Sequence, residues 1–223
     1  MKYRKLLVIL AFAFAAPIAQ AGLMVNFADL ANGNTATSNG TGATGEAGHQ
    51  PYEYTWGTVV LTVRGWETNG ASADTESYAY LDSTSGGRVG GMGVCTTLSG
   101  TQCSPSSDDN VSPGEYLTLS FNDDVYLENL AFNNNHDGGF ASSSVLIDGI
   151  STGMTDGFGP TTIDSGWTLL AGQILKLEFV DGGTGASNHF YLESLSVDVP
   201  EPSVLALLGL GLVGIGFARR RRS

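Results

Sequence analysis

Short runs of alternating apolar and polar residues, separated by Gly, Asn, Asp and Ser, restrict the fold of this chain more than any other feature of its sequence. In Glu115–Phe121 the apolar residues Leu117, Leu119 and Phe121 alternate with Thr and Ser, and Gln173–Phe179 follows the same pattern. A period of two residues is that of a β-strand with one buried face and one solvated face. The chain is therefore expected to form antiparallel strands joined by turns.

No window outside the two ends of the chain has the period of an amphipathic helix. We therefore predict an all-β fold, an antiparallel β-sandwich or a jelly roll, over residues 22–198. Within it, residues 31–48 carry almost no large apolar side chain, which indicates a flexible loop. The predicted strands are Tyr52–Trp56, Thr58–Arg64, Ser77–Leu81, Glu115–Phe121, Val125–Phe132, Ser143–Ile147, Gln173–Val180 and Phe190–Val197.

The last predicted strand changes phase along its length. Phe190 and Leu192 lie on one face of an ideal strand, whereas Leu195 and Val197 lie on the other. Either a β-bulge shifts the phase, or Glu193 is directed to a place where its carboxylate has a purpose. The bulge is the interpretation that the pattern favours.

Charged residues are distributed unevenly along the chain. Most of the ten basic residues are at the two ends, and the stretch from Gly22 to Pro202 holds three basic and 22 acidic residues, a net charge of −19. A surface this acidic repels nucleic acid and anionic lipid, so we expect the body of the protein to bind neither. Its carboxylates would attract divalent cations or simply keep the protein soluble.

Residues 1–21 have the features of a secretory signal peptide. Basic residues precede the apolar stretch Leu6–Ala16, and Ala19 and Ala21 form the small-x-small pattern of a cleavage site. The apolar stretch extends roughly 16 Å as a helix, which is too short to span a membrane core of about 30 Å. Cleavage by signal peptidase after Ala21 is therefore expected, rather than an N-terminal anchor.

The other end of the chain has the features of a membrane segment with an accessible junction before it. Pro200 and Pro202 flank Glu201, and two prolines so close together end a strand and keep the backbone extended. Val204–Ala218 contains no charged residue and leads into a basic cluster, an order typical of a helix whose basic end stays in the cytoplasm. The cluster is Arg219, Arg220, Arg221 and Arg222.

The length of this apolar segment is short for a membrane helix. It would extend roughly 22 Å, so a thinner bilayer and the long arginine side chains would have to make up the difference to about 30 Å. The alternative is a buried C-terminal helix. Four glycines and the lack of a polar face count against it.

Pro200-Glu201-Pro202, the short apolar segment and the terminal arginines together resemble the PEP-CTERM sorting signal over residues 199–223. The resemblance implies export in a Gram-negative bacterium that makes exopolysaccharide, with a transient anchor in the inner membrane. It also implies processing at or near Pro200-Glu201-Pro202 by an exosortase, a membrane-embedded enzyme resembling a cysteine transpeptidase. These three residues would be recognised by that enzyme, and the product would reach the cell surface or extracellular matrix.

Cys95 and Cys103 are the two cysteines of the chain. Their spacing is not that of a Cys-x-x-Cys motif, and no histidine flanks them at the spacing of metal ligands. In an exported protein an even number of cysteines indicates a structural disulfide, because the envelope is oxidising. A bridge across so short a loop stabilises the fold by about 2–3 kcal/mol in the chain-entropy account.

The sequence shows no catalytic motif, so we expect a non-catalytic protein. Gly185-Ala186-Ser187-Asn188-His189 lacks the last glycine of a nucleophile elbow. Neither a His-Glu-x-x-His pair nor a phosphate-binding loop is present. Carboxylates are so frequent, however, that the residue types alone leave a glycosidase pair open.

Calcium is the cofactor that the residues suggest most directly. Asp108, Asp109 and Asn110 lie in one predicted loop, and Glu115 begins the next predicted strand. Calcium takes about six to eight oxygen ligands, which carboxylates and loop carbonyls supply, although the spacing is not that of an EF-hand. The alternative is a solvated acidic turn. A second and weaker candidate is Asn133-Asn134-Asn135-His136-Asp137.

Three functions are compatible with an exported all-β protein of this kind. The first is adhesion to exopolysaccharide through exposed aromatic side chains that stack on sugar rings, unless those side chains are buried in the core. The second is a secreted carbohydrate-active hydrolase. The third is ice binding, because a similar tail occurs on some ice-binding proteins, but the longest Thr array is Thr35-Ala36-Thr37. The aromatic candidates are Tyr52, Tyr54, Trp56, Trp66, Tyr78 and Tyr80.

N-terminal sequencing tests the predicted signal peptide. The exported protein is expected to begin at Gly22, since signal peptidase cuts after the small-x-small pattern that ends at Ala21. A protein in the envelope fraction that still begins at Met1 would contradict the prediction.

Overall fold

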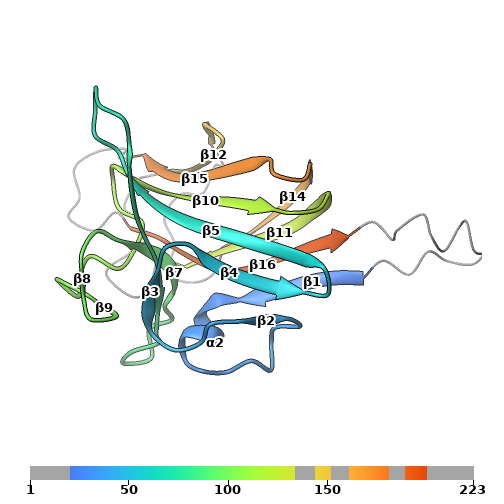
Figure 1. Ribbon diagram of the computed structural model, residues 1–223, viewed down its shortest axis with the longest axis horizontal. Helices are drawn as coiled ribbons and strands as arrows, with labels where there is room; N and C mark the ends of the chain where they lie inside the picture. The colour runs from blue at the N-terminus through green and yellow to red at the C-terminus, as the bar shows by residue number, and fades with distance from the viewer. Residues whose placement is uncertain (1–20, 134–143, 152–160, 181–188, 200–223) are drawn as a thin grey trace, which may run out of the picture. The chain divides into compact units, whose positions relative to one another are not determined.

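A computed structural model describes residues 21–133, 144–151, 161–180 and 189–199 (Figure 1). Contacts group residues 22–199 into one compact unit. The predicted signal sequence up to residue 20, the sorting segment from residue 200 and the predicted helix Val204–Ala218 lie outside the described residues. Within the described ranges, no helix is long and apolar enough to span a membrane.

Almost all of the regular structure in the described residues is β-strand. In chain order the elements are β1 (Ala21–Asn26), α2 (Phe27–Ala31), β2 (Thr41–Gly42), β3 (Ala47–His49), β4 (Tyr52–Trp56), β5 (Val59–Glu67), β6 (Thr75–Asp82), β7 (Gly91–Cys95), β8 (Leu98–Ser99), β9 (Gln102–Cys103), β10 (Glu115–Phe121), β11 (Val125–Asn133), β12 (Ser144–Ile147), β13 (Ile150–Ser151), β14 (Thr161–Leu169), β15 (Ile174–Val180) and β16 (Tyr191–Val199).

Antiparallel pairing links most of these strands into one continuous sheet that curls back on itself (Figure 1). The order along the sheet is β13-β12-β15-β10-β5-β6-β7-β16-β11-β14. Strand β1 pairs with β16, β3 with β6, and β4 with β5, while β8 and β9 form a separate hairpin. The antiparallel all-β fold predicted from the sequence is therefore confirmed.

The sheet turns a corner within β6. The first residues of β6, up to Ser77, pair with β5, whereas the residues from Tyr78 onward pair with β7. At this corner Gly65 of β5 approaches β6 so closely that a Cβ atom would lie 2.6 Å from the carbonyl oxygen of Tyr78. Glycine is required there because any side chain would push the two backbones apart.

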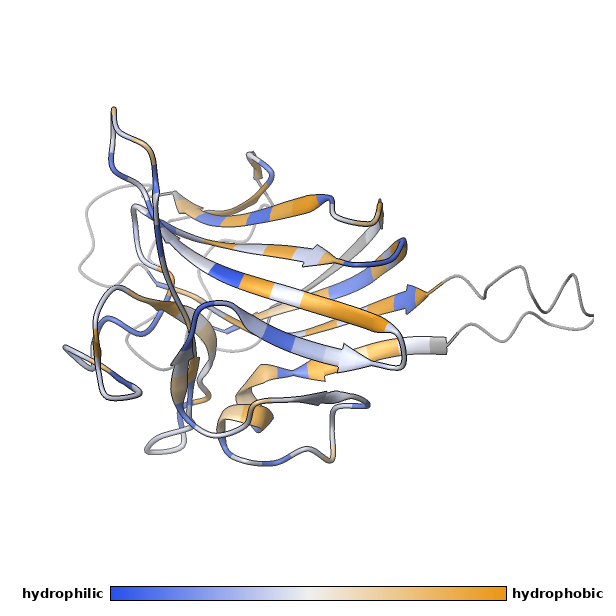
Figure 2. Cartoon of the chain, viewed as in Figure 1, coloured by the Kyte–Doolittle hydropathy of each residue, from blue (hydrophilic) through white to orange (hydrophobic). Residues whose placement is uncertain are grey.

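The curled sheet encloses one hydrophobic core, to which both of its arms contribute. Leu117 and Leu119 of β10 come from one arm, and Leu127 and Leu130 of β11 come from the other. Figure 2 shows apolar and polar residues alternating along β5 and β15, as expected for strands with one buried face. Each fully buried aliphatic side chain stabilises the fold by roughly 1.5–3 kcal/mol, so the shared core holds the two arms together.

The segment 31–48, predicted from its composition to be a flexible loop, contains the short strand β2 and the first two residues of β3. Two buried tyrosines of β4 hold this segment. The Tyr52 hydroxyl donates to the carbonyl oxygen of Ala43 at 3.0 Å, and the Tyr54 hydroxyl accepts from the N–H of Gly40 at 2.7 Å. The segment is thus fastened by side chains that lie outside it, which its own composition does not reveal.

The predicted strands correspond to β4, β5, β6, β10, β11, β12, β15 and β16. Three longer strands, β1, β7 and β14, were not predicted. Strand β7 is buried along its whole length, so it has no polar face and therefore no alternation. Gly91 and Gly93 weaken the strand signal further, because glycine is uncommon in strands.

The phase change predicted in β16 is a β-bulge. Leu192 and Ser194 pair with consecutive residues of β11, which leaves Glu193 as the extra residue. The Glu193 side chain is half-buried, and this burial, followed by the charge of Asp29, raises its pKa. The apolar residues that the bulge brings into the core are Phe190, Leu192, Leu195 and Val197.

A Gly65→Ala substitution tests the corner. We expect it to destabilise the protein by about 1–3 kcal/mol, the usual cost of forcing extra volume into a packed site. In a domain of this size that corresponds to a Tm lower by roughly 2–4 °C for each kcal/mol. Gly22→Ala is the matched control, since its Cβ would meet nothing closer than 3.5 Å. Equal melting temperatures for the two variants would show that the corner does not depend on Gly65.

Candidate functional site

The segment that contains the predicted calcium ligands lies directly against β7. A Cβ atom at Gly93 would lie 2.0 Å from the carbonyl oxygen of Asp109, so only glycine allows this approach. The N–H of Val94 donates to the carbonyl oxygen of Asn110 at 3.3 Å. Residue Val111 then pairs with Phe190, just before β16. The segment therefore joins β7 to the start of the last strand.

The carboxylates of Asp108 and Asp109 both accept hydrogen bonds from distant parts of the chain. Asp108 accepts from the N–H of Thr96 at 3.2 Å and also from the hydroxyl of the same residue. Asp109 accepts from the Tyr191 hydroxyl at 2.8 Å in a buried contact. Both aspartates thus fasten the segment to neighbouring strands.

Asn110 and Glu115 are held through Ser112. The Asn110 side-chain oxygen accepts from the Ser112 hydroxyl at 2.7 Å, and Glu115 accepts from the Ser112 N–H at 2.9 Å. The same hydroxyl lies 3.0 Å from Nδ1 of His189. Asn110 and Glu115 are also buried.

Calcium binding by these residues stays a prediction. Within the described part of the chain, Asp108, Asp109 and Glu115 do not bring three ligand atoms within 4.8 Å of one another. The group that meets this distance is Cys95, Cys103 and Asp108, and its two sulfur atoms are already joined to each other. The acidic segment predicted to bind calcium is engaged in hydrogen bonds within the protein.

The second calcium candidate falls mostly outside the described residues, which end this stretch at Asn133. Asn133 itself is buried, and its side-chain amide donates to the carbonyl oxygen of Val89 at 2.7 Å. It therefore serves to hold the loop before β7 against β11.

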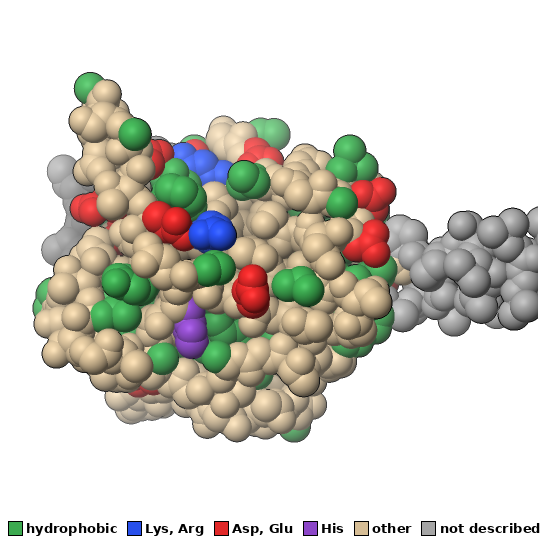
Figure 3. All heavy atoms as spheres, in the orientation of Figure 1, with side chains coloured by type: hydrophobic (Ala, Val, Ile, Leu, Met, Phe, Trp, Pro, Cys, Tyr) green, Lys and Arg blue, Asp and Glu red, His purple; other side chains and the backbone are tan. Residues whose placement is uncertain are grey.

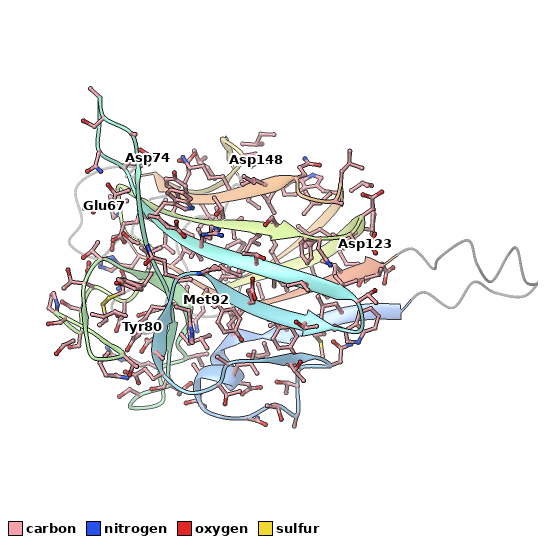
Figure 4. The ribbon with its side chains drawn as sticks, viewed as in Figure 1. Glu67, Asp74, Tyr80, Met92, Asp123 and Asp148 are labelled. Carbon is pink, nitrogen blue, oxygen red and sulfur yellow. A yellow bond between two sulfur atoms is a disulfide. The ribbon has the colours of Figure 1, made fainter. Side chains whose placement is uncertain are left out.

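Glu115 is the titratable group of the acidic segment whose pKa is shifted most clearly. Burial, followed by the negative charges of Asp108 and Glu67, raises the pKa of its carboxyl to about 8, although hydrogen bonds from Ser112 act in the opposite direction. Glu67 and Asp74 lie near the same end of β5 (Figure 4). A carboxyl group with this pKa is largely protonated at neutral pH.

The predicted disulfide is present. Cys95 at the end of β7 is bonded to Cys103 of β9, with the Cα atoms 5.8 Å apart. The bridge closes the β8–β9 hairpin and packs beside Tyr80, Tyr78 and Leu98 in a small second cluster. It therefore stabilises a projecting loop outside the main core.

The aromatic residues considered for sugar stacking divide into two groups. Three of them are buried in the protein interior, as in the alternative given above: Tyr52, Tyr54 and Tyr80. The other three, Trp56, Trp66 and Tyr78, are only partly exposed. None of the three tyrosines is available to a ligand, because each side chain is at most 1% exposed.

Trp66 belongs to a cross-strand row on the outer face of the sheet. Its ring is stacked on that of Tyr116, with 6.0 Å between the centroids, and Lys176 Nζ lies 4.1 Å from the Tyr116 ring centroid. Trp66 donates to the Thr118 hydroxyl at 2.9 Å, and Tyr116 donates to Asp74 at 2.7 Å. Figure 3 shows basic side chains on this face beside acidic ones. The polar groups of this row therefore have hydrogen-bond partners within the protein.

A groove of about 340 Å³ lies where the two ends of the curled sheet approach each other. The sequence alone does not reveal this groove. One sequence pattern does indicate the hairpin at its edge, because Asp148-Gly149 between two isoleucines is typical of a two-residue hairpin turn. In the structure both turn residues have positive φ values, 49° and 77°. The residues that line the groove are Ile147, Asp148, Ile150, Gly166, Trp167, Thr168, Leu169, Gln173 and Leu175.

The sorting residues predicted from the sequence lie largely outside the described ranges. Ala21 begins β1, and Val199 ends β16, immediately before Pro200-Glu201-Pro202. A family model described as the PEP-CTERM protein-sorting motif matches residues 198–222. The chain carries a PEP-CTERM sorting motif. This motif implies an exported protein that an exosortase processes and that is sorted through the membrane to the cell surface.

The match of the PEP-CTERM motif includes Pro200, Glu201 and Pro202, together with all four terminal arginines, so the resemblance noted in the sequence is confirmed. The motif covers the tail and the last two residues of β16, and not the rest of the β-sheet body. No curated protein and no solved structure matches the chain.

The pH dependence of stability tests the environment of Glu115. Its pKa lies above the value of 4.5 expected in the unfolded chain, so the folded protein binds more protons than the unfolded protein between about pH 4.5 and 8. The contribution of Glu115 to stability is therefore lost as the pH rises through this window. In Glu115→Gln we expect a Tm that falls less between pH 5 and pH 8 than in the unmodified protein.

The exposed residue Glu53 supplies the control, and Glu53→Gln is expected to keep the Tm profile of the unmodified protein. The profiles are measured by calorimetry at constant ionic strength. A Glu115→Gln profile parallel to that of the unmodified protein would contradict the assignment.

Proposed function

We propose that this protein is a non-catalytic surface or matrix protein that is released from the inner membrane by an exosortase and then adheres to polysaccharide. The observation that carries the proposal is the sorting motif over residues 198–222. A chain with this tail is delivered to the envelope of a cell, where the extracellular matrix is within reach. The motif marks the chain as the substrate of a processing enzyme.

The route to the surface has three steps in this proposal. Signal peptidase removes residues 1–21 by cutting after Ala21, with Ala19 as the other small residue of the site. Val204–Ala218 then holds the chain in the inner membrane, with the terminal arginines in the cytoplasm because basic residues resist translocation. The exosortase finally cuts at or near Pro200-Glu201-Pro202. The bounds of the compact unit, residues 22–199, support these two cutting sites.

The body left after processing is proposed to be a jelly-roll-like β-sandwich. The corner in β6 and the core shared by the two arms of the sheet support this description. In some β-sandwiches a strand passes from one sheet to the other through a bend of the kind seen in β6.

Adhesion, rather than hydrolysis or ice binding, is the activity proposed for this body. Residues 22–199 carry a net charge of −18, which favours an uncharged polymer, because polyanions such as nucleic acids or uronate polymers are repelled. Two partly exposed tryptophan side chains, Trp56 and Trp167, supply aromatic rings at the surface. An aromatic ring presents an apolar face and, in tryptophan, a polar N–H as well.

Replacement of Pro200, Glu201 and Pro202 by alanine tests the sorting step. We expect export to be intact but the uncut protein to remain in the inner membrane, since the recognition sequence is lost while the anchor is kept. Fractionation followed by intact-mass measurement distinguishes the cut protein from the uncut protein. A strain without its exosortase should give the same retained species.

Substitution of Ser203, next to the motif, by alanine is the control and should leave release unchanged. If the triple variant reached the surface or medium with the same mass as the unmodified protein, the sorting proposal would be wrong.

A further inference from the structure

The groove lies between the two ends of the sheet. Within the described residues, β13 is the last strand at one end and β14 is the last strand at the other. The groove is lined by the β12–β13 hairpin and β15 on one side, and by β14 on the other. The curl therefore stops short of closing into a barrel, and we call the space that remains the seam groove, with the lining residues given above.

The floor of the seam groove is apolar, and its rim is polar. Ile147, Leu169 and Leu175 are buried below it, and the Trp167 ring is partly exposed beside them. The rim carries the exposed residues Asp148, Thr168 and Gln173. An apolar surface with a few placed polar groups is the usual composition of a small-molecule site.

Two of the rim side chains are held in place by backbone hydrogen bonds. Asp148 accepts from the N–H of Lys176 at 2.7 Å, and Gln173 Oε1 accepts from the N–H of Leu170 at 3.1 Å. Figure 4 shows Asp148 at the turn beside β12 and β15. The amide nitrogen of Gln173 has no hydrogen-bond partner among the described residues. This N–H donor is therefore open to solvent, while the amide oxygen holds the side chain in place. Fixed polar groups lower the entropy cost of binding.

This combination suits a sugar better than a purely apolar molecule. A pyranose ring has a C–H face, which packs on an aromatic ring, and hydroxyl groups at its edge, which exchange hydrogen bonds with carboxylate, amide and hydroxyl groups. The volume of about 340 Å³ lies near the lower end of ligand pockets, ~300–1,000 Å³. The groove therefore accommodates a short stretch of a polymer chain.

The negative charge of the body favours an uncharged sugar over an anionic one. Asp148 stands at the rim, and the two nearest basic side chains on this arm are paired, Lys176 with Glu178 and Arg64 with Glu76. An anionic polymer would meet negative charge without a free cation to balance it. We propose that the seam groove binds an uncharged polysaccharide, with Trp167 under a sugar ring and Asp148 and Gln173 on its hydroxyl groups.

This inference rests on the proposed function and names the site through which adhesion would occur. Its test is calorimetric titration of the processed protein with cello-, laminari- and malto-oligosaccharides, and with alginate as the anionic probe. We expect binding to at least one neutral probe and none to alginate. Trp167→Ala should weaken that binding about tenfold or more, the effect of losing a central aromatic contact.

Two further variants separate binding from folding. Thr168→Arg places bulk on the exposed rim without removing a core contact, and it should weaken binding at an unchanged Tm. Trp66→Ala is the matched control, since Trp66 lies on the outer face and does not line the groove. It should bind within about twofold of the unmodified protein.

The possible outcomes distinguish this inference from the proposed function. If the unmodified protein binds a neutral probe and both groove variants bind it equally well, adhesion stands and the seam groove is not its site. If the protein binds none of the probes and no exopolysaccharide of its host, both proposals fail.

A second copy of the chain is the competing occupant, because Ile150, which lines the groove, is 68% exposed. Sedimentation measures this directly. A dimer that Ile150→Asp converts to a monomer would assign the groove to self-association and overturn the sugar proposal.

Discussion

At Gly65 the backbones of β5 and β6 approach so closely that not even a methyl group fits between them, and this contact determines where the sheet can bend. Because β6 pairs with β5 before the bend and with β7 after it, the two arms face each other and share one core. A flat sheet of these strands would leave its apolar face exposed to water. The bulge at Glu193 also keeps apolar side chains away from water, since it returns those in the second half of β16 to the buried face of the sheet.

The curl also explains why a groove exists at all. Strand β14 pairs with β11 and β15 pairs with β10, so two strands that follow each other in the chain belong to opposite arms. The short turn from Leu170 to Gln173 connects them, and the arms stay apart by the width of the side chains between them. Had β13 and β14 paired, the sheet would have closed and Trp167 would have become part of the interior. An unfinished sheet thus supplies a binding surface that a barrel would lack.

Strands with one solvated face, such as β10 and β15, could be predicted from the sequence. Their apolar and polar residues alternate because one face is buried and the other is exposed. Strand β7 could not, because it is covered on both sides and its Gly93 is explained only by the Asp109 backbone lying on it. The hydrogen bonds of the acidic segment could not be predicted either, because the Tyr191 hydroxyl that holds Asp109 comes from 82 residues further along the chain. Trp167 was missed for the same reason, since the groove forms only where two distant strands meet.

Strand β16 is the last strand before the sorting motif, yet it lies in the middle of the sheet, between β7 and β11. Its partners precede it by long stretches of sequence, as in the pairing of Leu192 with Met92. Such non-local pairing makes folding slow, and here it cannot be completed until the final strand has been delivered. Until that strand arrives, the sheet lacks the element that joins β7 to β11. The sheet can therefore close only when the segment that leads directly into the sorting motif has been delivered.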